Sequence, residues 1–347
     1  MPVVTAERLH RLAVALYEHA GVPPAEARTV ADHQVEANLA GHDSHGVHLL
    51  PTYLDRIRKG HIVPGAPFEV LDETPTTARV DGHWGLGQVV STRAMALCIE
   101  KARRQRVAIV SVFRQSHVGR LGDYPLMAAR AGLVGLMMCD SGQAPKQVAP
   151  FGGREARLGT NPLSIAFPSD LEAPLLVDMA TSAAAGGKLM VAIARHEPIP
   201  PGLLLDRDGR PTTDPTQFLA GGAMLPLGGA QGYKGTALSF AVETLAAVLP
   251  GLGFGVDPQG RHNDGAFLLA FDPAAFRPLA EFKADVAAFA RYLAATPPAE
   301  GFTEVLYPGE VEYRTAQRRR REGIPVEDET WGRLTALARA AGLAGLL

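Results

Sequence analysis

The segment RVAIVSVFRQSHVGRLG, residues 106–122, joins an apolar run to a turn that contains a histidine and two glycines. Residues 106–113 form the short, continuous apolar run that is typical of a strand buried on both faces. His117 follows the predicted strand and precedes Gly119 and Gly122, and a side chain in such a turn can approach a ligand closely. Since a helix is predicted over residues 121–131, the segment predicts a strand–turn–helix unit with a candidate site at the strand end.

The rest of the chain alternates in the same way. Short apolar runs predict further strands at residues 76–80, 134–139, 163–167, 175–179 and 266–271. Helical spacing predicts helices within residues 5–58, interrupted at 21–24, and at residues 88–104, 182–194, 233–249, 276–294 and 327–341. These elements predict an α/β or α+β protein with a sheet core. Residues 198–226 are rich in Pro and Gly, and their length predicts a functional loop.

The composition and charge of the chain are those of a globular protein. The chain has 347 residues, 46% hydrophobic and 20% charged, with a net charge of −2, which is typical of a globular protein and gives no reason to expect nucleic acid or membrane partners. The apolar stretch 235–256 contains Glu243 and Pro250, so a core helix followed by a loop is favoured over a membrane span. Cys98 and Cys139 lie in apolar runs and are expected to be buried and reduced, which predicts the cytoplasm.

The usual nucleotide fingerprints are absent from the sequence. The glycines at 85 and 87 lack the third glycine of a dinucleotide-binding loop. Lys188 follows Gly187 but is followed by leucine, without the upstream glycine of a phosphate-binding loop. These patterns alone therefore predict no nucleotide cofactor.

Ser44-His45-Gly46 lies between two predicted helical segments. If the following turns are helical, His45 shares a face with Leu49 and Tyr53, and the core face is formed by Val47, Leu50, Leu54 and Ile57. An imidazole off the core face suits proton transfer near neutral pH. His42, His45 and His48 also suggest a metal site, but spacings of three and six spread the rings over a wide arc, unlike the i, i+4 zinc pair, so no metal is predicted.

Taken together and in order, five stretches resemble the type 2 malate/L-lactate dehydrogenase family. They are Ser44–Gly46, Ser116–Gly119, Gly159–Pro162, Asp178–Ser182 and Pro308–Glu310. The resemblance extends from Gly41 to about Leu337. It implies the mixed sheet-and-helix fold of sulfolactate dehydrogenase-like proteins, which is not a Rossmann fold, and homodimers or larger assemblies. It also implies one family unit over 1–347, in which about 71–274 form the cofactor-binding sheet domain and about 1–70 pack with about 275–347.

The resemblance also implies an activity and a site. The family transfers hydride between NAD or NADP, here with NAD preferred, and a 2-oxo acid or cyclic imino acid. Its acid/base corresponds to His117 or His45, and we rank His117 first. The implied substrate contacts are Ser44, Tyr53, Thr160 and Asn161, and we add Arg120 because it lies three residues beyond His117 in a turn flanked by glycines. The implied cofactor contacts are Ser141, Asp178, Met179, Ala180, Ser182, Lys188, Lys234, Gly309 and Glu310.

Two departures from the family pattern bear on the substrate. Leu49 stands where the common motif has the arginine that holds the substrate carboxylate, and Arg120 stands where the common loop has a small residue. The loop is similar to that of the hydroxycarboxylate dehydrogenase branch, which favours larger 2-oxo acids. We therefore predict a 2-hydroxy-acid dehydrogenase in which Arg120 has become the carboxylate clamp. The alternatives are a cyclic imino-acid reductase and a non-catalytic metal-binding homologue.

Overall fold

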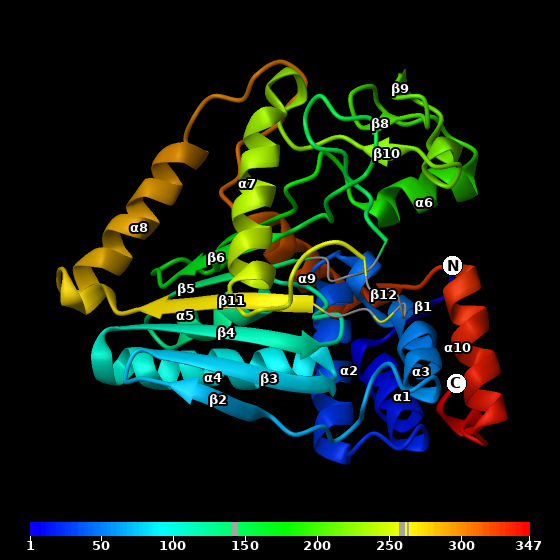
Figure 1. Ribbon diagram of the computed structural model, residues 1–347, viewed down its shortest axis with the longest axis horizontal. Helices are drawn as coiled ribbons and strands as arrows, with labels where there is room; N and C mark the ends of the chain where they lie inside the picture. Colours follow the sequence, from blue (N-terminus) through cyan, green and yellow to red (C-terminus); the bar gives the residue numbers. More distant parts are fainter. Residues whose placement is uncertain (141–144, 257–260, 262–263) are drawn as a thin grey trace.

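A seven-stranded mixed sheet forms the centre of the protein (Figure 1). The computed structural model describes residues 1–140, 145–256, 261 and 264–347. The sheet order is β2-β3-β4-β11-β5-β6-β7, with β3 and β4 parallel and the other neighbours antiparallel. Its strands are β2 (Glu69–Glu73), β3 (Thr77–Gly85), β4 (Val107–Gln115), β5 (Val134–Cys139), β6 (Leu163–Phe167), β7 (Leu175–Met179) and β11 (Asp264–Phe271). This architecture confirms the predicted mixed α/β class.

Strand β11 holds the middle of the sheet, although it is the last of the seven along the chain. It pairs with β4 on one side and β5 on the other. Ala266, Leu268 and Ala270 have no exposed surface, because all three lie on the face of the strand that α4 covers. The apolar run predicted at 266–271 is thus confirmed as a central strand.

The two faces of the sheet are covered by different helices. Helices α4 (Gly87–Gln105) and α5 (Asp123–Arg130) pack on one face, while α7 (Tyr233–Glu243) continues into a π-helical turn, Thr244–Val248, on the other. Met95 of α4, Val110 of β4 and Met137 of β5 are fully buried in the core between the sheet and α4. Each such side chain contributes about 1.5–3 kcal/mol through burial. Helix α8 (Leu279–Ala294) lies on the same side of the sheet as α7 in Figure 1, set apart from it.

A second core joins the two ends of the chain. Helices α1 (Ala6–His19), α2 (Pro24–Leu39) and α3 (Leu50–Arg58) pack with α9 (Glu310–Glu322) and α10 (Asp328–Ala340). Strand β1 (Val3–Val4) pairs with β12 (Ile324–Pro325), and both termini lie beside α10 in Figure 1. The division into domains stays a prediction. Among the described residues, no helix combines the length and the apolar character that crossing a bilayer would need.

The stretch predicted as a loop over 198–226 is partly folded. It carries β8 (Leu204–Leu205), β9 (Pro211–Thr212) and β10 (Ala223–Met224), which form a small sheet. Leu204 and Met224 are fully buried against Leu189 of α6 (Gly186–Arg195). Its functional role stays a prediction.

Two local predictions are wrong. Helix α6 was predicted to begin at Ser182 but begins at Gly186. Its N-cap residue, Ala185, makes no side-chain capping hydrogen bond. The hydroxyl of Thr181 donates to the Thr160 carbonyl and that of Ser182 to the Ala184 carbonyl, so neither caps a helix. The segment after Ser44 is also not one helix. Residues 43–49 form two 3₁₀ turns separated at Gly46, whose extended backbone (ψ −157°) interrupts the helical hydrogen bonds.

Candidate active site

The loop after β4 carries His117 and is fixed along its length. Gly87 at the start of α4 donates its N–H to Ser116 Oγ at 2.9 Å, and a side chain at 87 would meet the Ser116 and His117 carbonyls. The Val118 N–H donates to Asp264 of β11 at 3.2 Å. Gly119 has a φ of 75°, which favours glycine. The loop therefore fixes the backbone of His117 just beyond the C-terminal end of β4.

The two predicted catalytic histidines lie together. The rings of His45 and His117 are stacked, with centroids 5.8 Å apart and planes inclined by 15°. Tyr53 of α3 is buried, and its Oη lies 2.6 Å from His117 Nδ1. His45 and Tyr53 thus converge on His117, although they do not share the helix face that was predicted. The core face over Val47, Leu50, Leu54 and Ile57 is confirmed.

The Ser44–Gly46 turn is positioned by α2 and α9. Asn38 of α2 accepts the Val47 N–H at 2.9 Å, and a side chain at Gly46 would lie 2.2 Å from Asn38 Oδ1. Ser44 Oγ lies 3.0 Å from His45 Nδ1. Burial lowers the pKa of His45 well below its usual value of 6.5, and the neighbouring His117 adds to this shift. The His45 ring therefore stays neutral near pH 7.

His42, His45 and His48, whose spacing suggests a metal site, have separate hydrogen-bond partners. His42 Nε2 lies 3.4 Å from Glu312 of α9, whereas His45 faces Ser44 and His48 Nε2 lies 3.0 Å from the Ser44 carbonyl. Their ring nitrogens therefore do not converge on one point.

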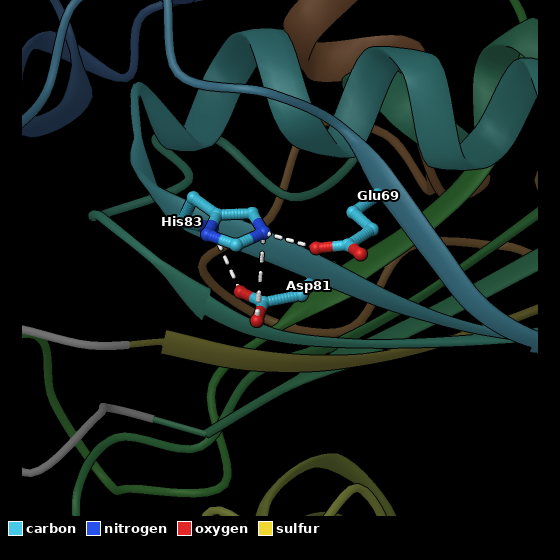
Figure 2. Close-up of side chains that lie close together, drawn as sticks. All are labelled: Glu69, Asp81 and His83. Atoms are coloured by element: carbon cyan, nitrogen blue, oxygen red, sulfur yellow. Dashed lines mark hydrogen bonds and ion pairs between the residues drawn. The ribbon is translucent and has the colours of Figure 1, made fainter.

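Another group of possible metal ligands lies at the β2–β3 end of the sheet. One ligand atom each from Glu69, Asp81 and His83 falls within 4.8 Å of the others, and Figure 2 shows the His83 ring between the two carboxylates. However, both oxygens of Asp81 accept hydrogen bonds from the Arg114 guanidinium. This guanidinium already supplies the positive charge that a metal would supply, so we assign the cluster a structural role.

Arg120 is the centre of a buried charge network. Its side chain is 7% exposed, with Nη1 2.9 Å from Asp123 Oδ1 and Nε 3.7 Å from Asp178 Oδ2. The backbone N–H of Arg120 donates to His33 Nε2 at 2.8 Å, and His33 Nδ1 lies 3.3 Å from Asp123 Oδ2. Burial lowers the pKa of His33, so its neutral ring can accept from Arg120 and donate to Asp123. The guanidinium thus faces two carboxylates of the protein itself.

Asp178 at the end of β7 connects this network to the predicted cofactor residues. Its Oδ2 accepts the Gly122 N–H at 3.0 Å, and burial raises its pKa to about 6. Thr160 lies beside the segment that follows Asp178, because its carbonyl accepts the Thr181 N–H at 2.9 Å. On the other side, the Pro308 carbonyl accepts the Leu176 N–H at 3.1 Å. The turn at Thr160, predicted to contact the substrate, is therefore adjacent to the Asp178–Ser182 segment, and Pro308 is adjacent to the strand that carries Asp178.

Asn161 lies in a second buried polar group. Its Nδ2 donates to Glu243 of α7 at 2.7 Å, and Lys146 Nζ lies 3.6 Å from the same carboxylate. Asn161 has a φ of 38° and is fully buried. Burial, together with Asp264 and Glu243, raises the pKa of Asp140 in the same region.

The remaining predicted cofactor contacts that the structure describes lie outside these buried polar groups. Lys188 and Lys234 are exposed, and Lys234 Nζ lies 5.9 Å from the Tyr233 ring. Glu310 begins α9 and pairs with Arg314 at 2.6 Å. Ser141 lies outside the described residues.

Sequence reasoning missed several residues that hold the site together. They are His33, Gln88, Asp123, Lys146, Glu243 and Asp264. Most are polar residues buried on helices or at strand ends, and their contacts cross from one element to another. One signal was available for Gln88. It is a polar residue directly before Val89 and Val90, which belong to the core.

The chain matches proteins of known type over almost its whole length. A family model described as malate/L-lactate dehydrogenase matches residues 4–335. The chain is 35% identical over 347 residues to L-sulfolactate dehydrogenase of Methanocaldococcus jannaschii, covering 98% of each chain. It is 35% identical over 345 residues to hydroxycarboxylate dehydrogenase B of Escherichia coli K12, covering 97% of this chain and 94% of that protein. It is also similar to the solved structure of delta1-piperideine-2-carboxylate reductase from Pseudomonas syringae, with a TM-score of 0.85, 32% identity, and coverage of 97% of this chain and 100% of that one.

Proposed function

Because the chain belongs to the malate/L-lactate dehydrogenase family, and is therefore an oxidoreductase, we propose that it interconverts a 2-hydroxy acid and a 2-oxo acid with NAD or NADP, NAD being preferred. The observation that carries this proposal is the convergence of His45, Tyr53 and His117 on a loop that also bonds to Asp178, the first residue of a predicted cofactor segment. It combines a proton-transfer group with a surface for a nucleotide.

His117 is the proposed acid/base. Reduction of a carbonyl needs a proton on the oxygen as hydride reaches the carbon, and an imidazole suits this step near neutral pH. Burial and His117 lower the pKa of His45, so His45 is neutral near pH 7 and a poor proton donor. We therefore assign His45, together with Ser44, Thr160 and Asn161, to substrate contact.

The predicted cofactor residues fit a nicotinamide nucleotide in their chemistry. Gly309 has a φ of 94°, and a side chain there would meet the Pro174 carbonyl at 2.3 Å, so this turn keeps its backbone close to β7. Hydroxyl, carboxylate and backbone groups for a ribose or phosphate come from Asp178, Met179, Ala180, Ser182, Gly309 and Glu310. When bound, the reduced cofactor supplies the hydride, and the chain supplies the proton and the orientation of the substrate.

The carboxylate clamp by Arg120 also stays a proposal. A buried substrate carboxylate needs a cationic partner, and a guanidinium offers parallel N–H donors. Arg120 would have to share its guanidinium between the substrate and Asp123 and Asp178. Arg120→Met should therefore raise the KM of the acid and leave that of the cofactor nearly unchanged. A rise in cofactor KM alone would identify a phosphate contact.

The activity is tested by mixing the protein with NADH or NADPH and a panel of 2-oxo acids, and following the reduced nicotinamide absorbance. Turnover is expected with at least one acid, and with the matching 2-hydroxy acid and oxidised cofactor in reverse. The matched control is His117→Gln, which keeps a similar size without a titratable ring. Absence of turnover with every acid would refute the proposal.

A second candidate is reduction of a cyclic imino acid, which the similarity to the piperideine-2-carboxylate reductase favours. Turnover of piperideine- or pyrroline-2-carboxylate, with none of any 2-oxo acid, would establish it. The metal-binding alternative is weakened because the His42, His45 and His48 rings have separate partners. Stoichiometric zinc in the purified protein would restore it.

We also propose that the protein is a homodimer or larger assembly in the cytoplasm. Large aromatic side chains are exposed on and beside α7 and α8, where a second copy would cover them: Phe240, Phe254, Phe276, Phe289, Tyr292 and Phe302. Light scattering on the purified protein should give a mass of at least twice 36.8 kDa. A single-chain mass at micromolar concentration would contradict the proposal.

A further inference from the structure

A buried hydrogen-bonded chain runs from α4 to the proposed acid/base. Gln88, which is fully buried, donates from Nε2 to Tyr53 Oη at 3.0 Å, and Tyr53 Oη lies 2.6 Å from His117 Nδ1. We infer that Gln88 is a positioning residue that sets, through Tyr53, which ring nitrogen of His117 carries the proton. The inference rests on the proposed function and adds a residue that does not touch the substrate.

The linking hydroxyl keeps its proton. Burial raises the pKa of Tyr53 far above the usual value of 10.0. Its oxygen can therefore donate one hydrogen bond and accept others. The hydroxyl of Tyr53 has Gln88 and His117 as neighbours. Whether it donates a hydrogen bond to His117 therefore depends on whether Gln88 donates to it or accepts from it.

With Gln88 Nε2 donating to Tyr53 Oη, the hydroxyl proton of Tyr53 is available to donate to His117 Nδ1. The neutral ring then carries its proton on Nε2. If the carboxamide turns by half a revolution, Gln88 Oε1 accepts from Tyr53, and Tyr53 accepts from His117 Nδ1–H. Gln88 Oε1 is buried and has no hydrogen-bond partner among the described residues, so no bond at its far end opposes this turn.

The second arrangement is the one that the reaction needs. A His117 imidazolium carries protons on both nitrogens, so Tyr53 Oη accepts the hydrogen bond from Nδ1–H and donates its own O–H hydrogen bond to Gln88 Oε1. Transfer of the Nε2 proton to the substrate oxygen then leaves a neutral ring with its proton on Nδ1. The reverse reaction starts from that ring, whose Nε2 is unprotonated and can accept a proton from the substrate hydroxyl. A carboxamide serves all of these states because it has both a donor and an acceptor end.

The test replaces Gln88 with methionine, which has a similar length but no such groups. Loss of the acceptor disfavours the imidazolium, so the pH midpoint assigned to His117 in kcat/KM should fall by about 1 unit. The kcat should fall by at least about 10-fold in both directions, a part of the usual contribution of acid–base catalysis. The cofactor KM should stay unchanged.

The chain offers a matched control. In the helical core, Tyr17 Oη donates to the fully buried Gln34 at 3.0 Å, which is the same kind of pair without a histidine. Gln34→Met should lower the melting temperature like Gln88→Met but leave the pH midpoint in place. Because Gln88 is inferred to act through Tyr53, adding Gln88→Met to Tyr53→Phe should cause no further loss of kcat.

Nitrogen-15 NMR of the histidine rings gives a readout that needs no substrate. In the parent protein His117 should titrate at the kinetic midpoint, and in Gln88→Met at a lower pH. An unchanged titration, or a further loss of kcat on the Tyr53→Phe background, would overturn the inference. These results differ from failure of the proposed function, in which the parent protein itself would turn over no substrate.

Discussion

Replacing Arg120 with methionine should destabilise the fold by about 3–5 kcal/mol at pH 8, the usual effect of removing one partner of a buried ion pair. The side chain is 7% exposed and faces Asp123 and Asp178 at 2.9 and 3.7 Å. Methionine fills the space of the arginine stem but leaves both carboxylates without the guanidinium. The loss should therefore be electrostatic in origin and should depend on pH.

The sign of that dependence follows from Asp178. Burial raises its pKa to about 6 from an ordinary value of 3.8, and Arg120 opposes the rise. An acid with a higher pKa in the folded state makes the fold lose stability as the pH rises between the two values. Without Arg120 the folded pKa rises further, and the window extends above 6. The deficit of the variant should consequently shrink when the pH is lowered from about 8 to about 5.

Urea unfolding followed by circular dichroism at both pH values measures this deficit. The control is Arg104→Met, which removes an exposed pair with Glu100 at 2.6 Å and should cost no more than about 1 kcal/mol. A loss for Arg120→Met as small as that of the control would refute the electrostatic reasoning. A large loss that is equal at both pH values would show that lost packing, and not charge, is responsible.

Three further outcomes are expected. His117→Gln should lower kcat by about 10²-fold or more, and a near-normal His117→Gln beside an inactive His45→Gln would reverse our ranking. Gly119→Ala should lower the free energy of unfolding by about 2 kcal/mol, since φ is 75° and the added carbon would lie 2.4 Å from His33 Nε2; an unchanged urea midpoint would contradict this. Both cysteines are buried, and burial raises the pKa of Cys98 to about 12, so native protein should react with a disulfide reagent only after unfolding. Fast labelling of folded protein would refute that expectation.

The central strands could be predicted from the sequence because they are buried on both faces. The predicted runs at 106–113, 134–139 and 266–271 are mainly apolar, and each lies within or largely within a strand of the core. Strand β2, with every residue exposed, has no such pattern, and it exists because it pairs with β3. The start of α6 was missed because Thr181 and Ser182 resemble caps but bond to other carbonyls.

The candidate site could be predicted only in part. His45, Tyr53 and His117 stand out by residue type and position, and the structure brings them together. Gln88 and His33 lie inside helices, and the sequence does not show which side chains they contact. Their roles arise from contacts between elements far apart in the sequence, such as the bond from Arg120 to His33.

The position of β11 has a consequence for the order in which the protein can assemble. A chain emerging from the ribosome completes β2-β3-β4 and β5-β6-β7 long before residue 264 is synthesised, yet β11 is what joins these two halves. Until then β4 and β5 each present an unpaired edge, which is a surface prone to intermolecular pairing. Closure of the sheet must therefore be late and dependent on long-range pairing. Nascent chains that stop before β11 should be the forms most in need of chaperones.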